Sequence, residues 1–286
     1  MSARRTPIAV CLLALALTGC GTGAHRRRGG AEPASSPLAV QRPAGRSIQV
    51  GAHPEGIVVD PVTGLVAVTT REPPALVLLD ARSGRVRSRI RLPGVARHLA
   101  LTGVPPTVLV PSEPLNRLLE VGLPSGRVSS IAVGKTPHDA AASAGRTFVG
   151  DEFGKGVSVV ERGQVTRAIG GFLQPGGVTV ARALVAVVDV GADTLTLIDP
   201  LTRRTLGTAA AGSGPTHGAG DPNGHVYVAD TRGEAVLDFA TRPRLRRVAR
   251  VALPGTPYGI AVDPARGRLW VTLTATNRLV EFGLSG

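Results

Sequence analysis

The sequence predicts an all-β protein, a six-bladed β-propeller, and a repeated stretch of sixteen residues supports this fold class. Residues 54–69 (PEGIVVDPVTGLVAVT) reappear as residues 257–272 (PYGIAVDPARGRLWVT) with nine of the sixteen residues identical. Weaker copies lie between them and begin at Ala96, Pro137, Pro175 and Pro215. Successive copies begin 42, 41, 38, 40 and 42 residues apart. A period of about 40 residues, with short strands and no helical periodicity, is typical of one propeller blade per repeat.

The first twenty residues predict a lipoprotein signal peptide. Arg4 and Arg5 precede an apolar stretch over residues 8–17, which is too short to span a bilayer as a helix. Residues 17–20 (LTGC) resemble a bacterial lipobox, which implies cleavage before Cys20 and lipidation of Cys20. We therefore expect a signal peptide over residues 1–19 and a protein held on the extracytoplasmic face of the cell membrane. The alternative is an ordinary secretory signal with an incidental cysteine.

Residues 20–46 predict a flexible linker, and residues 47–286 form the predicted propeller. The linker is rich in Gly, Pro, Ser and Arg and has no hydrophobic periodicity. Residues 26–28 are three arginines that could meet anionic headgroups, although a solvated spacer explains them equally well. Because Cys11 leaves with the signal peptide, the mature chain keeps one cysteine and forms no internal disulfide.

The formal net charge overstates the basicity of the predicted propeller, and the predicted location argues against a nucleic-acid partner. The whole chain carries +13, but without residues 1–46 it has 26 basic and 19 acidic residues and a net charge of +7. Outside the cytoplasm nucleic acid is not an expected partner. We expect a monomer that contacts the membrane through the lipid on Cys20 and binds a protein or another ligand of the cell envelope.

Each repeat predicts four short strands separated by turn residues. In the first repeat these strands are Ile57–Asp60, Leu65–Thr69, Leu76–Asp80 and Val86–Leu92. The later second strands are Val108–Pro111, Phe148–Asp151, Leu184–Asp189, Val226–Asp230 and Leu269–Thr272. The third strands are Arg117–Val121, Val157–Glu161, Leu195–Asp199, Ala235–Phe239 and Arg278–Phe282. The fourth strands are Val128–Val133, Val165–Ile169, Thr205–Ala209 and Val248–Leu253. Gly64 and Gly84 supply the positive φ that the hairpins need.

The last repeat stops after its third strand, which raises the question of how the ring closes. The segment Ser47–Val50 precedes the first repeat and has the length of a short strand. We predict that it pairs with the third strand of the last blade, so that this sheet keeps no free edge.

The repeats resemble those of a known family. The stretches PEGIVVDP, PYGIAVDPARGRLWVT, NGHVYVADT and DTLTLIDPLTRRT are similar to the YVTN-type propeller repeats of bacterial surface proteins, which themselves resemble NHL repeats. The resemblance covers residues 47–286 and implies the propeller fold. It indicates little about function, because the fold carries binding proteins, scaffolds and enzymes. The copy at Ala96 lacks the proline, and the copy at Pro137 lacks the Asp-Pro turn.

The loops that lead into the first strands and follow the second strands should meet on one face, around the central channel. Candidate ligand-binding residues in the leading loops are His53, Glu55, Arg97, His98, His138, Asp139, His217 and Tyr258. The following loops add Glu72, Glu113, Asp151, Glu152, Asp189, Asp193, Asp230 and Glu234. The opposite face carries Arg82, Arg85, Arg127, Arg203, Arg204, Arg242, Arg244, Arg246 and Arg266. The sequence thus predicts a disc with histidine and carboxylate on one face and arginine on the other.

A divalent metal is the candidate cofactor at this channel mouth. His98 and His217 occupy equivalent positions three blades apart and should face each other, and Asp139 holds the same position in its repeat. We predict these three as ligands of zinc or manganese, which accept imidazole and carboxylate together. His138 and Asp139 are neighbours on one strand and should point apart, so only one of them can serve. A solvated polar mouth without metal is the alternative.

The first functional hypothesis is a binding or scaffold module, and the second is a metal-assisted lyase or lactone hydrolase at the channel mouth. The sequence has no G-x-S-x-G, C-x-x-C or H-E-x-x-H motif. The arginine-rich run over residues 241–250 could bind anionic polymers or lipid headgroups, but protection of an outermost strand from edge pairing explains it better.

Overall fold

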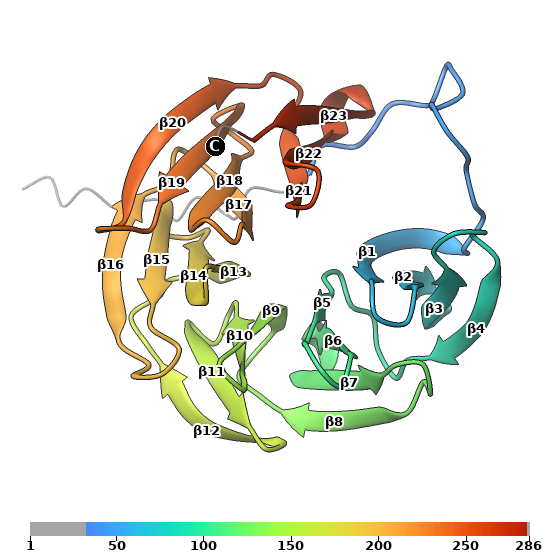
Figure 1. Ribbon diagram of the computed structural model, residues 1–286, viewed down its shortest axis with the longest axis horizontal. Coiled ribbons are helices and arrows are strands. Elements are labelled where there is room, and N and C mark those ends of the chain that lie inside the picture. Colours follow the sequence, from blue (N-terminus) through green and yellow to red (C-terminus); the bar gives the residue numbers. More distant parts are fainter. Residues whose placement is uncertain (1–32, 285–286) are drawn as a thin grey trace, which may run out of the picture.

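Six antiparallel sheets surround a central channel, as Figure 1 shows, and this confirms the predicted six-bladed β-propeller. The computed structural model describes residues 33–284, so the predicted signal peptide and Cys20 lie outside the described residues. In each blade the first strand lies next to the channel and the later strands follow outward. Among the described residues, no helix has the length and apolar character needed to cross a membrane.

The strands predicted within the six repeats are all present, with boundaries within a few residues of those expected. Blades 1 and 2 contain β1 (Ala52–Asp60), β2 (Leu65–Glu72), β3 (Pro74–Asp80), β4 (Val86–Arg91), β5 (Ala100–Leu101), β6 (Thr107–Ser112), β7 (Arg117–Gly122) and β8 (Val128–Ala132). Blades 3 and 4 contain β9 (Pro137–Ser143), β10 (Arg146–Asp151), β11 (Gly156–Glu161), β12 (Gln164–Ile169), β13 (Pro175–Ala181), β14 (Leu184–Asp189), β15 (Thr194–Ile198) and β16 (Thr205–Ala210). Blades 5 and 6 contain β17 (Pro215–Gly220), β18 (His225–Asp230), β19 (Ala235–Ala240), β20 (Arg246–Ala252), β21 (Pro257–Asp263), β22 (Arg268–Leu273) and β23 (Arg278–Gly283). Short 3₁₀ turns, η1 (Glu113–Leu115) and η2 (Thr274–Thr276), follow β6 and β22.

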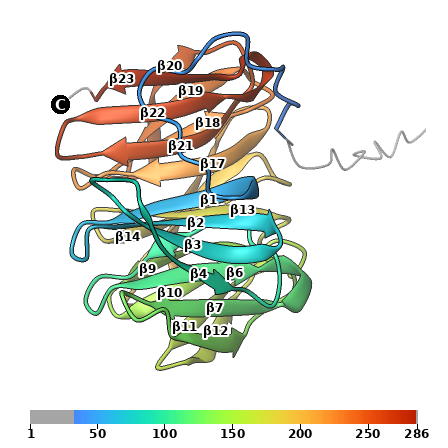
Figure 2. The same ribbon diagram turned by 90° about the vertical axis from the view of Figure 1, so that its right-hand side faces the viewer.

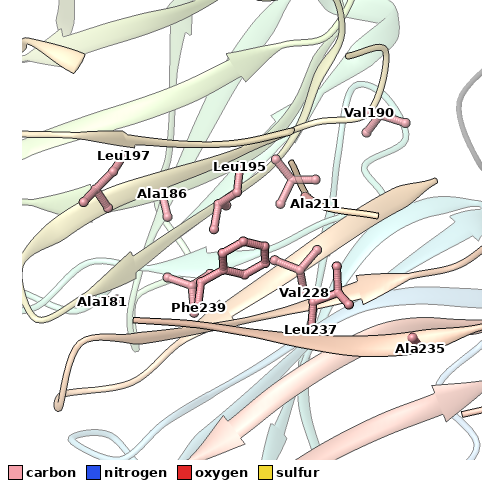
Figure 3. Close-up of a cluster of buried hydrophobic side chains, with 12 residues drawn as sticks. Ala181, Ala186, Val190, Leu195, Leu197, Ala211, Val228, Ala235, Leu237 and Phe239 are labelled. Carbon is pink, nitrogen blue, oxygen red and sulfur yellow. The ribbon is translucent and has the colours of Figure 1, made fainter. Parts of the chain in front are cut away.

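The apolar core lies between neighbouring blades. Because successive side chains of a strand point to opposite faces of its sheet, a central strand packs against both neighbouring blades. Such a strand is an almost continuous apolar run, as in β14 (LVAVVD), where every residue after the first is buried. Figure 3 shows Leu195 of blade 4 beside Val228 and Phe239 of blade 5 in one of these clusters. Each blade is therefore stabilised mainly by its neighbours.

Residues that are identical in the two copies of the repeated stretch form the same hydrogen bond in blades 1 and 6. The hydroxyl of Thr69 accepts a hydrogen bond from the Gly56 N–H at 2.9 Å, and Thr272 accepts one from Gly259 at 2.8 Å. A side chain at Gly56 would lie 2.9 Å from Leu99 Cγ, so the close approach of two strands requires glycine there. These contacts explain why the first two strands of both blades have the same residues at these positions.

The predicted closure of the ring by Ser47–Val50 is wrong. The sheet of blade 6 has three strands, β21, β22 and β23, and residues 47–50 belong to no strand. Val50 instead packs against Val68, Val77 and Leu79, on a face of blade 1. Arg89 Nη1 also donates a hydrogen bond to the Val50 carbonyl at 2.6 Å. The segment covers an apolar sheet face, and this burial competes successfully with pairing at a distant sheet edge.

The junction between blades 6 and 1 therefore differs from the others, and we call it the seam. Residues 33–50 cross it, as Figures 1 and 2 show. On blade 6, the Ala34 N–H donates to Thr274 Oγ1 at 3.1 Å, and Asn277 Nδ2 donates to the Pro37 carbonyl at 3.2 Å. On blade 1, Ile57 is 63% exposed. The connection across the seam is thus residues 33–50, which we call the strap, rather than a shared sheet.

Candidate functional site

Three histidine rings from three different blades meet at the mouth of the channel. His98 lies just before β5, His138 is the second residue of β9, and His217 is the third residue of β17. The His98 ring centroid lies 4.5 Å from the centroids of His138 and of His217. Nε2 of His98 and Nε2 of His217 are 3.2 Å apart. The first strands line the channel, and this placement brings residues more than a hundred positions apart into contact.

The prediction that His98 and His217 face each other is confirmed by this contact, whereas the expected participation of Asp139 is wrong. Asp139 Oδ2 accepts a hydrogen bond from the Val178 N–H of the next blade at 2.9 Å, and Oδ1 accepts one from Ala140 at 2.8 Å. Burial raises the pKa of Asp139 to about 6. The short carboxylate is held at the neighbouring strand, while the longer imidazole of His217 reaches the channel. Neighbouring residues do point apart, but His138 is the one that joins the cluster.

Two glutamates orient the His138 ring. Nδ1 of His138 lies 2.8 Å from Glu113 Oε1 and 3.5 Å from Glu152 Oε2. Glu152 in turn accepts a hydrogen bond from Gln174 Nε2 at 2.7 Å. Because a carboxylate can only accept, Nδ1 of His138 carries a proton and Nε2 is left facing away from the two glutamates. A carboxylate behind the ring is the usual arrangement for a metal-ligating histidine.

The electrostatics of the cluster keep the paired imidazoles neutral. Burial, reinforced by the nearby charges of His217, His138 and Arg97, holds the pKa of His98 well below its usual range. Burial and the same two charges, His138 and Arg97, lower the pKa of His217 to about 3. Burial acts to raise the pKa of Glu113, but its hydrogen bond and charge interaction with His138 outweigh burial, so the net change is downward. At neutral pH the site thus presents the neutral imidazoles of His98 and His217 near the ionised carboxylate of Glu113.

The remaining predicted residues fall into two groups. Tyr258 packs edge-on against His217 with ring centroids 4.5 Å apart, and its hydroxyl accepts a hydrogen bond from Arg97 Nη2 at 3.2 Å. Arg97 and Tyr258 therefore border the cluster. His53 is exposed, and Glu55 forms an ion pair with Arg71 at 2.9 Å, at the exposed start of β1. The structure does not bring these two into the histidine cluster.

Sequence reasoning did not single out Glu113, Glu152 or Gln174. Glu113 and Glu152 were two of eight acidic residues expected after second strands, and nothing in their spacing distinguished them. Glu113 and Glu152 differ from the other acidic residues in their blades. They follow the second strands of blades 2 and 3, on either side of His138. Asp189 and Asp230 hold comparable positions in blades 4 and 5, but their carboxylates accept backbone N–H groups of surrounding loops. Those two residues stabilise loops and do not reach the cluster.

The spacing of the donor atoms would allow one metal ion to be held. Each of the three histidines offers a ring nitrogen, and these nitrogens all lie within 4.8 Å of one another. Two nitrogens bound to one tetrahedral zinc ion at its usual bond length are about 3.3 Å apart, close to the 3.2 Å between the paired Nε2 atoms. Glu113, His138 and Glu152 form a second group of donors within the same limit. His138 belongs to both groups and connects them.

No protein-family model and no curated protein matches the sequence, whereas many solved structures match the fold. A streptogramin B lyase has 14% identity and a TM-score of 0.68, and the match covers 82% of this chain and 84% of that one. Virginiamycin B lyase from Staphylococcus aureus has 14% identity and a TM-score of 0.66, covering 82% and 85%. Kuenenia stuttgartiensis hydrazine synthase has 12% identity and a TM-score of 0.58, covering 86% and 99%. At these identities, the chain shares with the lyases the six-bladed β-propeller fold.

Proposed function

We propose that the channel mouth binds one divalent transition-metal ion through His98, His138 and His217, and that the protein is a metal-assisted lyase or hydrolase. The observation that carries the proposal is the 3.2 Å contact between Nε2 of His98 and Nε2 of His217. Two neutral imidazoles whose Nε2 atoms lie this close together can bind one ion with little movement of either ring. Both are held away from protonation by burial.

The residues present fit zinc better than manganese, magnesium or calcium. Imidazole ligands suit zinc, whereas the other three ions prefer carboxylates, carbonyls and water. Three histidines are also a known ligand set of catalytic zinc, in which the fourth position stays open. The bound ion would supply Lewis acidity toward a carbonyl or toward a water molecule. Glu113 orients His138, and Glu152, held by Gln174, is placed to move a proton.

The reaction class follows from two supports. The solved structures of similar fold include lyases by name, and a metal beside a carboxylate base suits both elimination and hydrolysis. The YVTN-like repeats and the lipobox at residues 17–20 support a location on the cell surface. We infer a lipid-anchored enzyme on the extracytoplasmic face of the membrane, acting on a ligand that enters the mouth beside Arg97 and Tyr258.

Calorimetric titration with zinc and with manganese tests the proposal. The chain from residue 20 onward, stripped with a chelator, should bind one equivalent. His98→Ala and His217→Ala should each abolish that binding, because two ligands cannot hold the ion as three do. His225→Ala is the matched control, since His225 pairs with Asp238 at 2.7 Å away from the mouth. No binding in the parent chain, or equal binding in all variants, contradicts a metal site.

A binding or scaffold module is the second candidate, and one observation favours it. Three members of the cluster already have polar partners without an ion, since His98 contacts His217 and His138 contacts Glu113, while Nδ1 of His217 is buried without one. A polar mouth of this kind can also bind a ligand directly. A thermal-shift screen with sugars and cell-wall fragments, in the absence of metal, tests this alternative, because ligands that bind the folded state raise the melting temperature.

A further inference from the structure

We propose that the outer wall of blades 4 and 5 is a docking surface for membranes that contain anionic lipids. This proposal concerns the side of the disc and does not depend on the channel mouth. The surface, here called the basic wall, consists of residues 201–210 and 241–251. These two segments contain no acidic residue and seven arginines, Arg203, Arg204, Arg242, Arg244, Arg246, Arg247 and Arg250.

The two segments form one continuous surface. They contain β16 and β20, which are the outermost strands of adjacent blades and lie next to each other in Figure 1. Leu245 packs against the apolar cluster shared by blades 4 and 5. A side chain at Gly207 of β16 would lie 3.9 Å from Leu245 Cβ. The arginines of both blades therefore belong to the same side of the molecule.

The positive charge of the basic wall is mostly directed at solvent. Arg203 lies 3.5 Å from Glu161, and Arg250 donates to the Gly233 carbonyl. The other five arginines form no ion pair with an acidic residue anywhere in the range 33–284. A guanidinium presents a planar set of donors that matches phosphate oxygens in pairs. The wall is thus suited to phosphate groups.

Exposed apolar side chains lie among these arginines. Leu201 and Leu206 of blade 4 are 66% and 54% exposed, and Val248 and Val251 of β20 are 38% and 47% exposed. Charge alone would protect the edge of β20 from pairing with another strand. It does not explain leucines on the neighbouring blade, which are unfavourable in water. Apolar side chains within a basic surface are typical of proteins that lie on the headgroup and acyl boundary of a bilayer.

A membrane fits these observations better than a soluble polyanion, because only a bilayer offers both phosphate and an apolar layer. The predicted lipid on Cys20 adds a second argument. Fourteen residues separate Cys20 from Ala34, and an extended chain of that length spans at most about 50 Å. A lipid anchor brings the domain close to the bilayer, where a basic patch adds electrostatic attraction to anionic lipids.

Vesicle sedimentation tests the proposal independently of lipidation. The chain from residue 20 onward, carrying Cys20→Ser, is mixed with vesicles of phosphatidylcholine alone or with about a third phosphatidylglycerol. We expect binding to the anionic vesicles only. The triple variant Arg244→Ser, Arg246→Ser, Arg247→Ser should bind at least about ten-fold more weakly. The triple variant Arg82→Ser, Arg85→Ser, Arg127→Ser removes the same charge from exposed hairpins of blades 1 and 2 and should bind like the parent.

The double variant Leu206→Ser, Val248→Ser separates a membrane from a soluble polyanion without changing charge. It should weaken vesicle binding and leave binding to polyphosphate unchanged. All substituted residues are exposed, so melting temperatures should stay at the parent value and verify the fold. The proposal is overturned by failure to bind anionic vesicles, by equal losses in the two triple variants, or by an apolar double variant that binds vesicles like the parent.

Discussion

The interface between blades 3 and 4 and the seam between blades 6 and 1 are built from equivalent positions in the repeat, yet their packing differs. Phe148 of β10 and Trp270 of β22 are equivalent, and each sits on the sheet face toward the next blade. Phe148 is fully buried, whereas Trp270 is only partly buried. Val178 of β13 is 4% exposed, while Ile57, its equivalent in β1, is 63% exposed. The same sequence pattern thus yields a closed core in one place and an open junction in another.

This difference shows that the repeat specifies a blade but not the closure of the ring. Within the ring, each sheet face is buried by the next repeat. At the seam the series of repeats begins and ends, and the connection depends on residues 33–50, which lie outside the repeat. The proposed metal ligands His98, His138 and His217 belong to blades 2, 3 and 5, on the closed side. We infer that the closed side positions the site and that the seam tolerates change.

The largest effect should come from truncating the buried member of the equivalent pair. Phe148→Ala should lower the free energy of unfolding by about 3–5 kcal/mol, because it leaves a cavity in a packed core. Trp270→Ala removes a larger side chain but should have an effect of about 1–2 kcal/mol, since a partly exposed ring loses less burial. Urea denaturation of both variants measures the difference. Equal losses, or a larger loss for Trp270→Ala, would show that the seam is packed like the other interfaces.

A buried carboxylate on the closed side should give a pH-dependent effect of intermediate size. Asp151 accepts a hydrogen bond from Ser158 at 2.6 Å, but its Oδ1 is buried without a partner, and burial raises its pKa to about 6. Since the folded pKa is above the unfolded value near 3.8, the protonated form is favoured by folding. The resulting stability is complete below pH 4 and is lost as the pH rises to 6.

Asp151→Asn should remove this dependence. Relative to the parent, the variant should gain about 2–3 kcal/mol between pH 4 and pH 7.5. Asp189→Asn is the comparison, because the Asp189 carboxylate accepts several backbone N–H groups and should lose stability on substitution. Denaturation at the two pH values measures both. A parent and an Asp151→Asn variant with parallel pH profiles would contradict the assignment.

The smallest effect concerns the strap across the seam. Val50→Ser should lower the free energy of unfolding by about 1 kcal/mol, because Val50 is partly buried against Val68 and Val77. Val40→Ser should have no effect, since Val40 is 94% exposed. Thermal unfolding of the two variants is the measurement. If both variants melt with the parent, residues 47–50 do not contribute to blade 1.

Much of the fold could be predicted because the spacing of residues within the repeat reflects contacts between residues that are close in sequence. The Gly56 and Thr69 pair and the turn residues Asp60 and Gly64 act within one blade, so their spacing is visible in the sequence. Closure could not be predicted in the same way. Val50 could be buried at the edge of blade 6 or on the face of blade 1. The sequence does not show which of these two contacts is the more stable.

The site was predictable to the extent that repeat position determines direction. His98 and His217 share a position and do meet. Asp139 shares this position too, but its carboxylate accepts a hydrogen bond from the Val178 N–H and does not reach the histidines. The orienting role of Glu113 depends on the distance between a turn of blade 2 and a strand of blade 3. Such distances between blades are set by packing, which no spacing in the sequence records.

The central claim, a metal ion held by three histidines at the channel mouth, is tested most directly by crystals of the protein soaked with zinc. An anomalous difference map at the zinc edge should show one peak about 2.0–2.1 Å from ring nitrogens of His98, His138 and His217. The two Nε2 atoms of His98 and His217 should then both point at the ion. An empty map at the mouth, with the hydrogen bond between these two rings intact, would contradict the account.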